Sequence, residues 1–191
     1  MELPSVVKNE LSVNGTGNRV AYPKRWLVAQ VRLYHEKKIS EHLNALGIEN
    51  FLPIQKQYRQ WSDRRKQIDF ILIPSKIFVH VDAKEQREVL TLSSVSRYMV
   101  MYGSSTPAVI PEEQMNQFKF MLDYSEEAIT LCEAPLSPGE MIRVIKGPLT
   151  GWEGEFISVN GKTKVVVRMD ALGCANVDMP LSFVESIHNN K

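Results

Sequence analysis

The chain contains no apolar run close to the about 20 residues that a membrane-spanning helix needs. Its first 24 residues lack both the apolar core and the small-residue cleavage site of a signal peptide. Cysteine is scarce, because Cys132 and Cys174 are the only two, and neither has the sequence spacing of a metal ligand. These absences favour a cytoplasmic protein with no membrane partner and no metal site.

The patterns typical of catalysis are missing as well. The four histidines show no metal-ligand spacing, and neither cysteine has the setting of a nucleophile paired with a base. The glycines between residues 147 and 154 lead into a strand, so they do not form a phosphate loop at a helix N-terminus. We therefore predict no enzyme activity, no catalytic residue and no cofactor.

Charge is nearly balanced overall but unevenly placed. The formal net charge of the 191 residues is +1. Six basic residues and two acidic ones lie between positions 54 and 76, whereas six acidic residues and one lysine lie between positions 110 and 133. The near-neutral total therefore conceals a basic segment and an acidic one.

Apolar periodicity divides the first part of the chain into alternating elements. It predicts strands over 25–31, 48–56, 68–73, 77–81 and 96–101, and helices over 34–46, 84–90 and from Pro111 onward. Gly47 stands where a helix C-terminal cap uses glycine, and Pro53 indicates an edge or a bulge in its strand. Since the strands return through hairpins, we expect an α+β fold with a mainly antiparallel sheet and packed helices.

The second part of the chain has the pattern of a small all-β unit. A Pro-Gly turn at 138–139 leads into a strand, a glycine-rich turn and a second strand, and Asn160-Gly161 indicates a further hairpin. Two more short strands, near 176–179 and 183–187, would close a five-stranded barrel. We expect a flexible tail over 1–24, a first domain over 25–124, a linker over 125–138 and a second domain over 139–188.

The second domain resembles a KOW domain, a small barrel found in transcription elongation factors and ribosomal proteins. The residues that carry this resemblance are Gly139, Val144, Lys146, Gly147, Pro148, Gly151 and Gly154.

The chain from 25 to 187 as a whole resembles the NusG family of bacterial transcription elongation factors. The likeness of the first (NGN) domain rests on the sequence Lys24-Arg25-Trp26, on Gln30 and on the stretches 73–79 and 107–113. Ile73 and Lys76 stand where the family tends to have aromatic residues, and Ser75 stands in place of glycine. The tail and the stretch 47–53 are more similar to specialised paralogs of the UpxY kind, which act as antiterminators of polysaccharide operons. A general factor and a specialised paralog both remain open, and the paralog is favoured.

The resemblance implies a contact with the clamp of the largest subunit of RNA polymerase. The matched positions and their neighbours are Tyr58, Ile73, Pro74, Lys76 and Tyr102. The protein would then be a monomer that suppresses pausing and termination. A ribosome-associated RNA-binding protein that uses its KOW domain is the alternative.

Two further surfaces are candidates for binding. The basic segment carries aromatic residues between its charges, which suits contact with DNA or RNA, although a solvated hairpin would look the same. Its candidate residues are Lys56, Arg59, Trp61, Arg64, Arg65 and Lys66. In relatives, the glycine-rich turn of the second domain meets the termination factor Rho or a ribosomal protein. Its candidate residues are Lys146, Gly147, Leu149, Gly151 and Trp152, of which Leu149 and Trp152 could equally pack beneath their own turn.

Overall fold

A computed structural model of the chain describes residues 23–60, 65–101, 103–124, 129–132, 139–159, 162–169 and 172–187. The expected tail lies almost entirely outside these residues, as do the tip of the basic hairpin and much of the expected linker. Within the described part, no helix is both long enough and apolar enough to cross a membrane.

The first sheet is antiparallel and has the order β2-β5-β1-β6, with β7 also pairing with β1. Its strands are β1 (Arg25–Val31), β2 (Glu49–Phe51), β5 (Lys76–Val81), β6 (Val95–Tyr98) and β7 (Val109–Ile110). The α-helices of the described residues are α1 (Glu36–Ala45), α2 (Ala83–Thr91) and α3 (Glu112–Tyr124). The expected α+β class is confirmed, and β7 is a strand that the sequence pattern did not predict.

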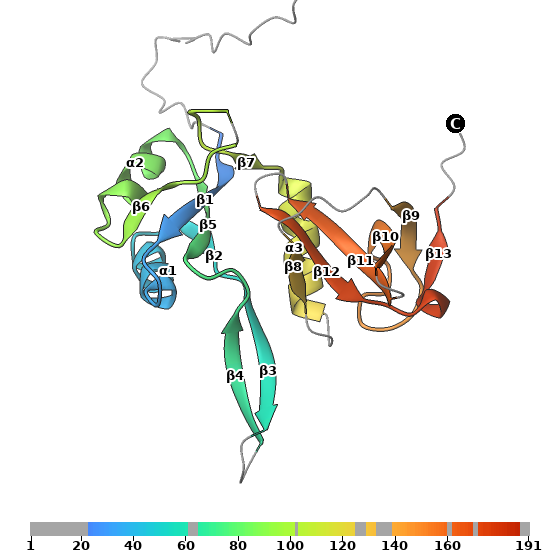
Figure 1. Cartoon of the computed structure of the whole chain (residues 1–191). Helices are drawn as coiled ribbons and strands as arrows, with labels where there is room; N and C mark the ends of the chain where they lie inside the picture. The colour runs from blue at the N-terminus through green and yellow to red at the C-terminus, as the bar shows by residue number, and fades with distance from the viewer. Residues whose placement is uncertain are drawn as a thin grey trace, which may run out of the picture.

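The expected strand over 48–56 is divided in two at Leu52-Pro53, because proline has no N–H to donate to a ladder. The second piece, β3 (Ile54–Gln60), leaves the sheet and pairs with β4 (Arg65–Ile71) as a separate two-stranded ribbon. This ribbon projects from the first sheet in Figure 1.

Helix α1 ends as the sequence predicts. Gly47 has φ 71°, its N–H donates to Asn44 O at 3.0 Å, and the Ile48 N–H donates to Leu43 O at 2.9 Å. This is the Schellman arrangement, in which a glycine in the left-handed region satisfies the last helix carbonyls. The predicted start of this helix, at residue 34, is two residues too early. Tyr34 has φ 65°, so it lies outside the helix, which begins at Glu36.

The second sheet has six strands in the order β13-β9-β10-β11-β12-β8. These strands are β8 (Thr130–Cys132), β9 (Glu140–Val144), β10 (Glu153–Val159), β11 (Lys162–Met169), β12 (Gly173–Asp178) and β13 (Val184–Ser186). Five of them follow the predicted pattern, but the described strands do not close into a barrel. The sixth, β8, comes from the expected linker and pairs with β12, so β8 is the edge strand on that side of the sheet.

The faces of the first sheet are covered by different helices. One face, which includes Leu27 and Ile77, packs with Ile39 and Leu43 of α1 and Val89 of α2. The other face, which includes Trp26, Val28 and Phe78, packs with α3. Strand alternation sends neighbouring side chains to opposite faces, so both faces of β1 and β5 are apolar.

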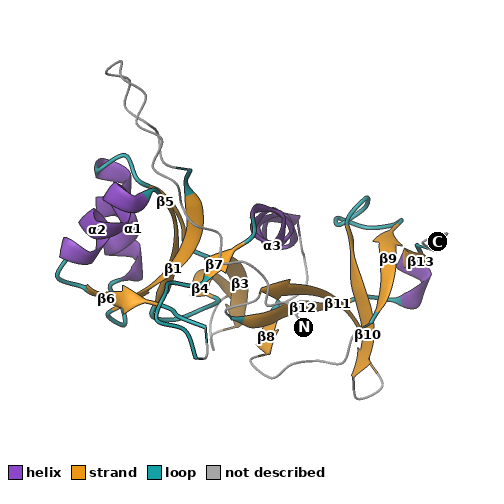
Figure 2. Cartoon of the chain, turned by 90° about the horizontal axis from the view of Figure 1, so that it is seen from above, coloured by secondary structure: helices purple, strands orange, loops and turns teal. Residues whose placement is uncertain are grey.

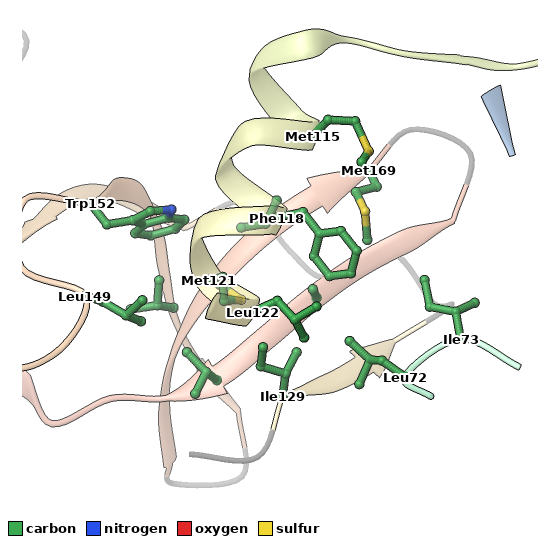
Figure 3. Packing of buried hydrophobic residues seen from close by; sticks show 14 of the residues in the cluster. Leu72, Ile73, Met115, Phe118, Met121, Leu122, Ile129, Leu149, Trp152 and Met169 are labelled. Carbon is green, nitrogen blue, oxygen red and sulfur yellow. The ribbon is translucent and has the colours of Figure 1, made fainter. Parts of the chain in front are cut away.

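Helix α3 is shared by the two sheets. Figures 1 and 2 show it between them, and it contacts β1 and β3 on one side and β11 on the other. Its buried residues Met115, Phe118, Met121 and Leu122 belong to a cluster that also contains Val165, Val167 and Met169 of β11. Figure 3 shows the four α3 side chains in one group with Met169. The two parts of the chain therefore share one hydrophobic core.

We expect Phe118→Ala to lower the free energy of unfolding by about 3 to 5 kcal/mol, because it leaves a cavity in this shared core. The matched control is Asn116→Ala, an exposed position on the same helix, which should change stability by less than about 0.5 kcal/mol. Denaturant unfolding measures both. Similar values for the two variants would contradict the shared core.

Candidate functional site

The turn between β4 and β5 carries three of the residues expected to contact polymerase. Ile73 is 4% exposed and belongs to the same hydrophobic cluster as α3. Pro74 is exposed, and Lys76 is half-buried at the start of β5, where it pairs with Gln30 of β1. Tyr102 lies outside the described residues, and Tyr58 is in β3 opposite Gln67. The surface of this turn therefore consists of Pro74 and Lys76, with Ile73 beneath it.

Ser75 gives this turn its shape. Its φ is 61°, the left-handed region that a glycine adopts without cost, so a serine here is strained. The Ser75 N–H donates to Glu36 Oε1 at 2.8 Å, and Ser75 O accepts from Val31 N at 2.9 Å. These two bonds tie the turn to α1 and to β1.

Glu36 is a residue whose role the sequence did not reveal. A carboxylate in the first turn of a helix suits the positive end of the helix dipole, which explains it without any further contact. In the structure Glu36 is 2% exposed and accepts the Ser75 N–H. It therefore positions the backbone next to Pro74 and Lys76.

Trp26 anchors α3 to the first sheet. Its ring is 1% exposed, and its Nε1–H donates to Glu112 Oε2 at 2.8 Å. The ring stacks on His80 with centroids 4.8 Å apart, and Lys119 Nζ of α3 lies 4.1 Å from the Trp26 ring centroid. Trp26, from the sequence Lys24-Arg25-Trp26 that carries the family resemblance, is thus a structural link between β1 and α3.

The backbone register of the basic ribbon pairs two of its basic residues. In the β3–β4 register Arg59 is the partner of Lys66, and Gln60 is the partner of Arg65. Trp61 and Arg64 fall at the tip, outside the described residues.

The base of the ribbon already has an ion pair. Lys37 Nζ lies 2.7 Å from Asp69 Oδ2, and that hydrogen bond is the main cause that holds the pKa of Asp69 below its usual range. Lys56, the register partner of Asp69, is exposed and contributes to the same shift. Lys37 is therefore the cation that pairs with Asp69. Because Lys37 belongs to α1, the positive charge of Lys56 on the ribbon is not cancelled by this pair.

The glycine-rich turn of the second sheet is built around its own apolar residues. Leu149 is 2% and Trp152 is 5% exposed, and both belong to the shared core. A Cβ added to Gly154 would lie 1.8 Å from the Trp152 ring, so only glycine fits beneath that ring. Lys146, Gly147 and Gly151 are exposed, and the two glycines have φ 88° and 90°. The partner-binding assignment stays a prediction, now with Leu149 and Trp152 as core residues.

Comparison with known proteins identifies the family. The family model described as "Transcription termination factor nusG" matches residues 24–119. The chain belongs to the NusG family, whose members are transcription factors that act without catalysing a reaction.

Solved structures show weaker likeness. One described as "Domain interaction in Thermotoga maritima NusG" is 18% identical with a TM-score of 0.47, and the match covers 86% of this chain and 98% of that chain. A structure of the MjSpt4:Spt5 complex in conformation A is 10% identical with a TM-score of 0.29, covering 85% and 97% of the two chains. A comparison with curated protein sequences gave no match.

The strained turns lead to a stability prediction. Tyr34 is 90% exposed at φ 65°, so Tyr34→Gly should raise the free energy of unfolding by about 0.5 kcal/mol, the difference between relieved strain and added chain entropy. Ser75→Gly should act in the same direction. Gly47→Ala is the reverse control, because nothing lies within 4 Å of an added Cβ and only the φ of 71° opposes it. Gly47→Ala should lower the free energy of unfolding by about 1 kcal/mol. Thermal unfolding of the three variants measures these changes, and a destabilised Tyr34→Gly would contradict the assigned strain.

Proposed function

We propose that this protein is a transcription elongation and antitermination factor that binds RNA polymerase through residues 25–124. The support is the family match, which covers residues 24–119, together with the turn of Pro74 and Lys76. This turn is fixed by Glu36 and Val31, so a binding surface there is pre-organised.

The mechanism requires no chemical step. A protein that binds one conformer of the polymerase more tightly than another shifts the population toward that conformer. Binding to the closed clamp would disfavour its opening, and pausing and termination would become less frequent. The target is proposed to be a specific set of operons, as for the specialised paralogs that the stretch 47–53 resembles.

The ribbon would contact DNA or RNA in the elongation complex. The register pairing of Arg59 with Lys66 supports this part of the proposal, because it gathers basic residues at one level of the ribbon, and basic residues suit contact with phosphates. The protein itself would be a monomer, and the exposed Lys146 turn would meet Rho or a ribosomal protein.

Lys76→Glu tests the polymerase surface. We expect it to weaken binding to isolated RNA polymerase by about tenfold, a loss of about 1.4 kcal/mol. Lys146→Glu is the matched control, since it makes the same charge change in the second sheet and should leave polymerase binding unaltered. Pull-down from native lysate followed by a binding titration measures both. Equal effects of the two variants, or recovery of ribosomal particles in place of polymerase, would contradict the proposal.

Arg64→Ala with Arg65→Ala tests the ribbon. The double variant should bind isolated polymerase normally but bind the full elongation complex more weakly, and its salt dependence should be shallower by about one unit of slope for each phosphate that it no longer neutralises. The control removes two exposed basic residues of α2, Lys84→Ala with Arg87→Ala. Equally weakened binding to both targets would indicate a protein contact, and unchanged binding to both would indicate a solvated hairpin.

A further inference from the structure

The two cysteines of the chain, distant in the sequence, are opposite each other in the second sheet. Cys132 of β8 and Cys174 of β12 are direct register partners in an antiparallel pair. Residues opposite each other in such a pair have Cα atoms about 4.5 to 5.5 Å apart, which is within the range that a disulfide spans. Cys174 itself is buried, with 2% of its surface exposed.

The next pair along the same face shows that this register brings opposite side chains together. Thr130 and Asn176 are register partners two residues away from the cysteines, and Thr130 Oγ1 donates to Asn176 Oδ1 at 2.7 Å. Side chains two residues apart in a strand lie on the same face. The cysteine positions therefore share the face on which an opposite pair is already in contact.

The neighbouring strand supplies a positive charge. Arg168 of β11 is the register partner of Cys174 on the side away from β8. The hydrogen bond with Glu155 is the main cause that raises the pKa of Arg168, and the coulombic interaction with Cys174 adds to it. Arg168 therefore lies beside Cys174 while its guanidinium is held by Glu155.

We propose that Cys132 and Cys174 form a reversible disulfide that fastens β8 to β12. The oxidant is a low-molecular-weight disulfide such as oxidised glutathione. The Cys132 thiolate attacks one of its sulfurs and releases one thiol. The Cys174 thiolate then attacks the Cys132 sulfur and releases the second thiol, so two cysteine thiols are oxidised and the two protons leave on the released thiols.

The position of β8 gives this bond a consequence for the whole chain. The Ile129 N–H, directly before β8, donates to the buried Gln55 Oε1 of β3 at 3.2 Å, while β8 itself pairs with β12. The segment thus bridges the part matched by the family model and the second sheet. A disulfide would make the β8–β12 half of this bridge covalent.

An oxidant can reach the buried Cys174 thiol when β8 detaches from the sheet, and β8 is short. This strand has three residues and is the last strand of the sheet. Short edge segments open locally at a lower free-energy cost than central strands. Oxidation is therefore expected at the rate of local opening, without global unfolding.

The experiment equilibrates the full-length protein with oxidised glutathione and then counts thiols under denaturing conditions. We expect both thiols to disappear, the mass to fall by two hydrogens without a glutathione adduct, and a non-reducing peptide map to join the segments that contain Cys132 and Cys174. The melting temperature should rise by about 5 to 10 °C, because the cross-link restricts the unfolded chain. A reductant should reverse every change.

Cys132→Ser and Cys174→Ser are the controls, and neither should show a shift of melting temperature between oxidised and reduced samples. A stable glutathione adduct on either cysteine of the native sequence, a disulfide between two chains, or two thiols that persist after equilibration would each overturn the proposal. None of these results bears on polymerase binding, which the Lys76→Glu titration measures separately.

Discussion

The burial of α3 between two sheets is the interaction on which the rest of the structure depends. Its apolar residues pack with Trp26 and Phe78 of the first sheet and with β11 of the second, in one cluster. A single helix that fills both interfaces explains why the second sheet does not need to close on itself, since α3 and its neighbours cover apolar residues of β11. Trp26 of β1 adds two direct contacts to α3, because its Nε1–H donates to Glu112 and its ring lies against the Lys119 cation.

This arrangement relates the candidate surfaces to the core. Ile73 is buried in the cluster that contains α3, whereas its neighbours Pro74 and Lys76 reach the surface. A ligand at this turn would therefore contact Pro74 and Lys76, which lie directly over the shared core. The strain at Ser75 fits the same view, because the bond to Glu36 and the bond to Val31 hold a backbone conformation that serine alone would avoid.

Local patterns predicted the elements well and their partners less well. The bounds of β1, the Gly47 cap and the apolar face of α3 followed from periodicity and glycine chemistry, which act within a few residues. The division of the strand at Pro53 needed only the missing N–H of proline. By contrast, β7 and β8 are short strands whose pairing depends on edges far away in the sequence, and no local signal marks them. The buried Glu36 was missed for the same reason, since its partner is 39 residues away.

The candidate site residues show the same difference between local patterns and contacts between distant residues. The register of the basic ribbon, which sets Arg59 opposite Lys66, could not be read from the sequence because residues 61–64 include neither glycine nor proline to specify a turn type. Leu149 and Trp152 illustrate the opposite difficulty: apolar residues in a turn suit either a partner or their own core, and only packing decides. The contact between Gly154 and the Trp152 ring shows that here packing determines the sequence of the turn. Gly154 is needed by the Trp152 ring, and Gly147 and Gly151 are needed for their φ of 88° and 90°. The exposed Lys146 carries neither constraint.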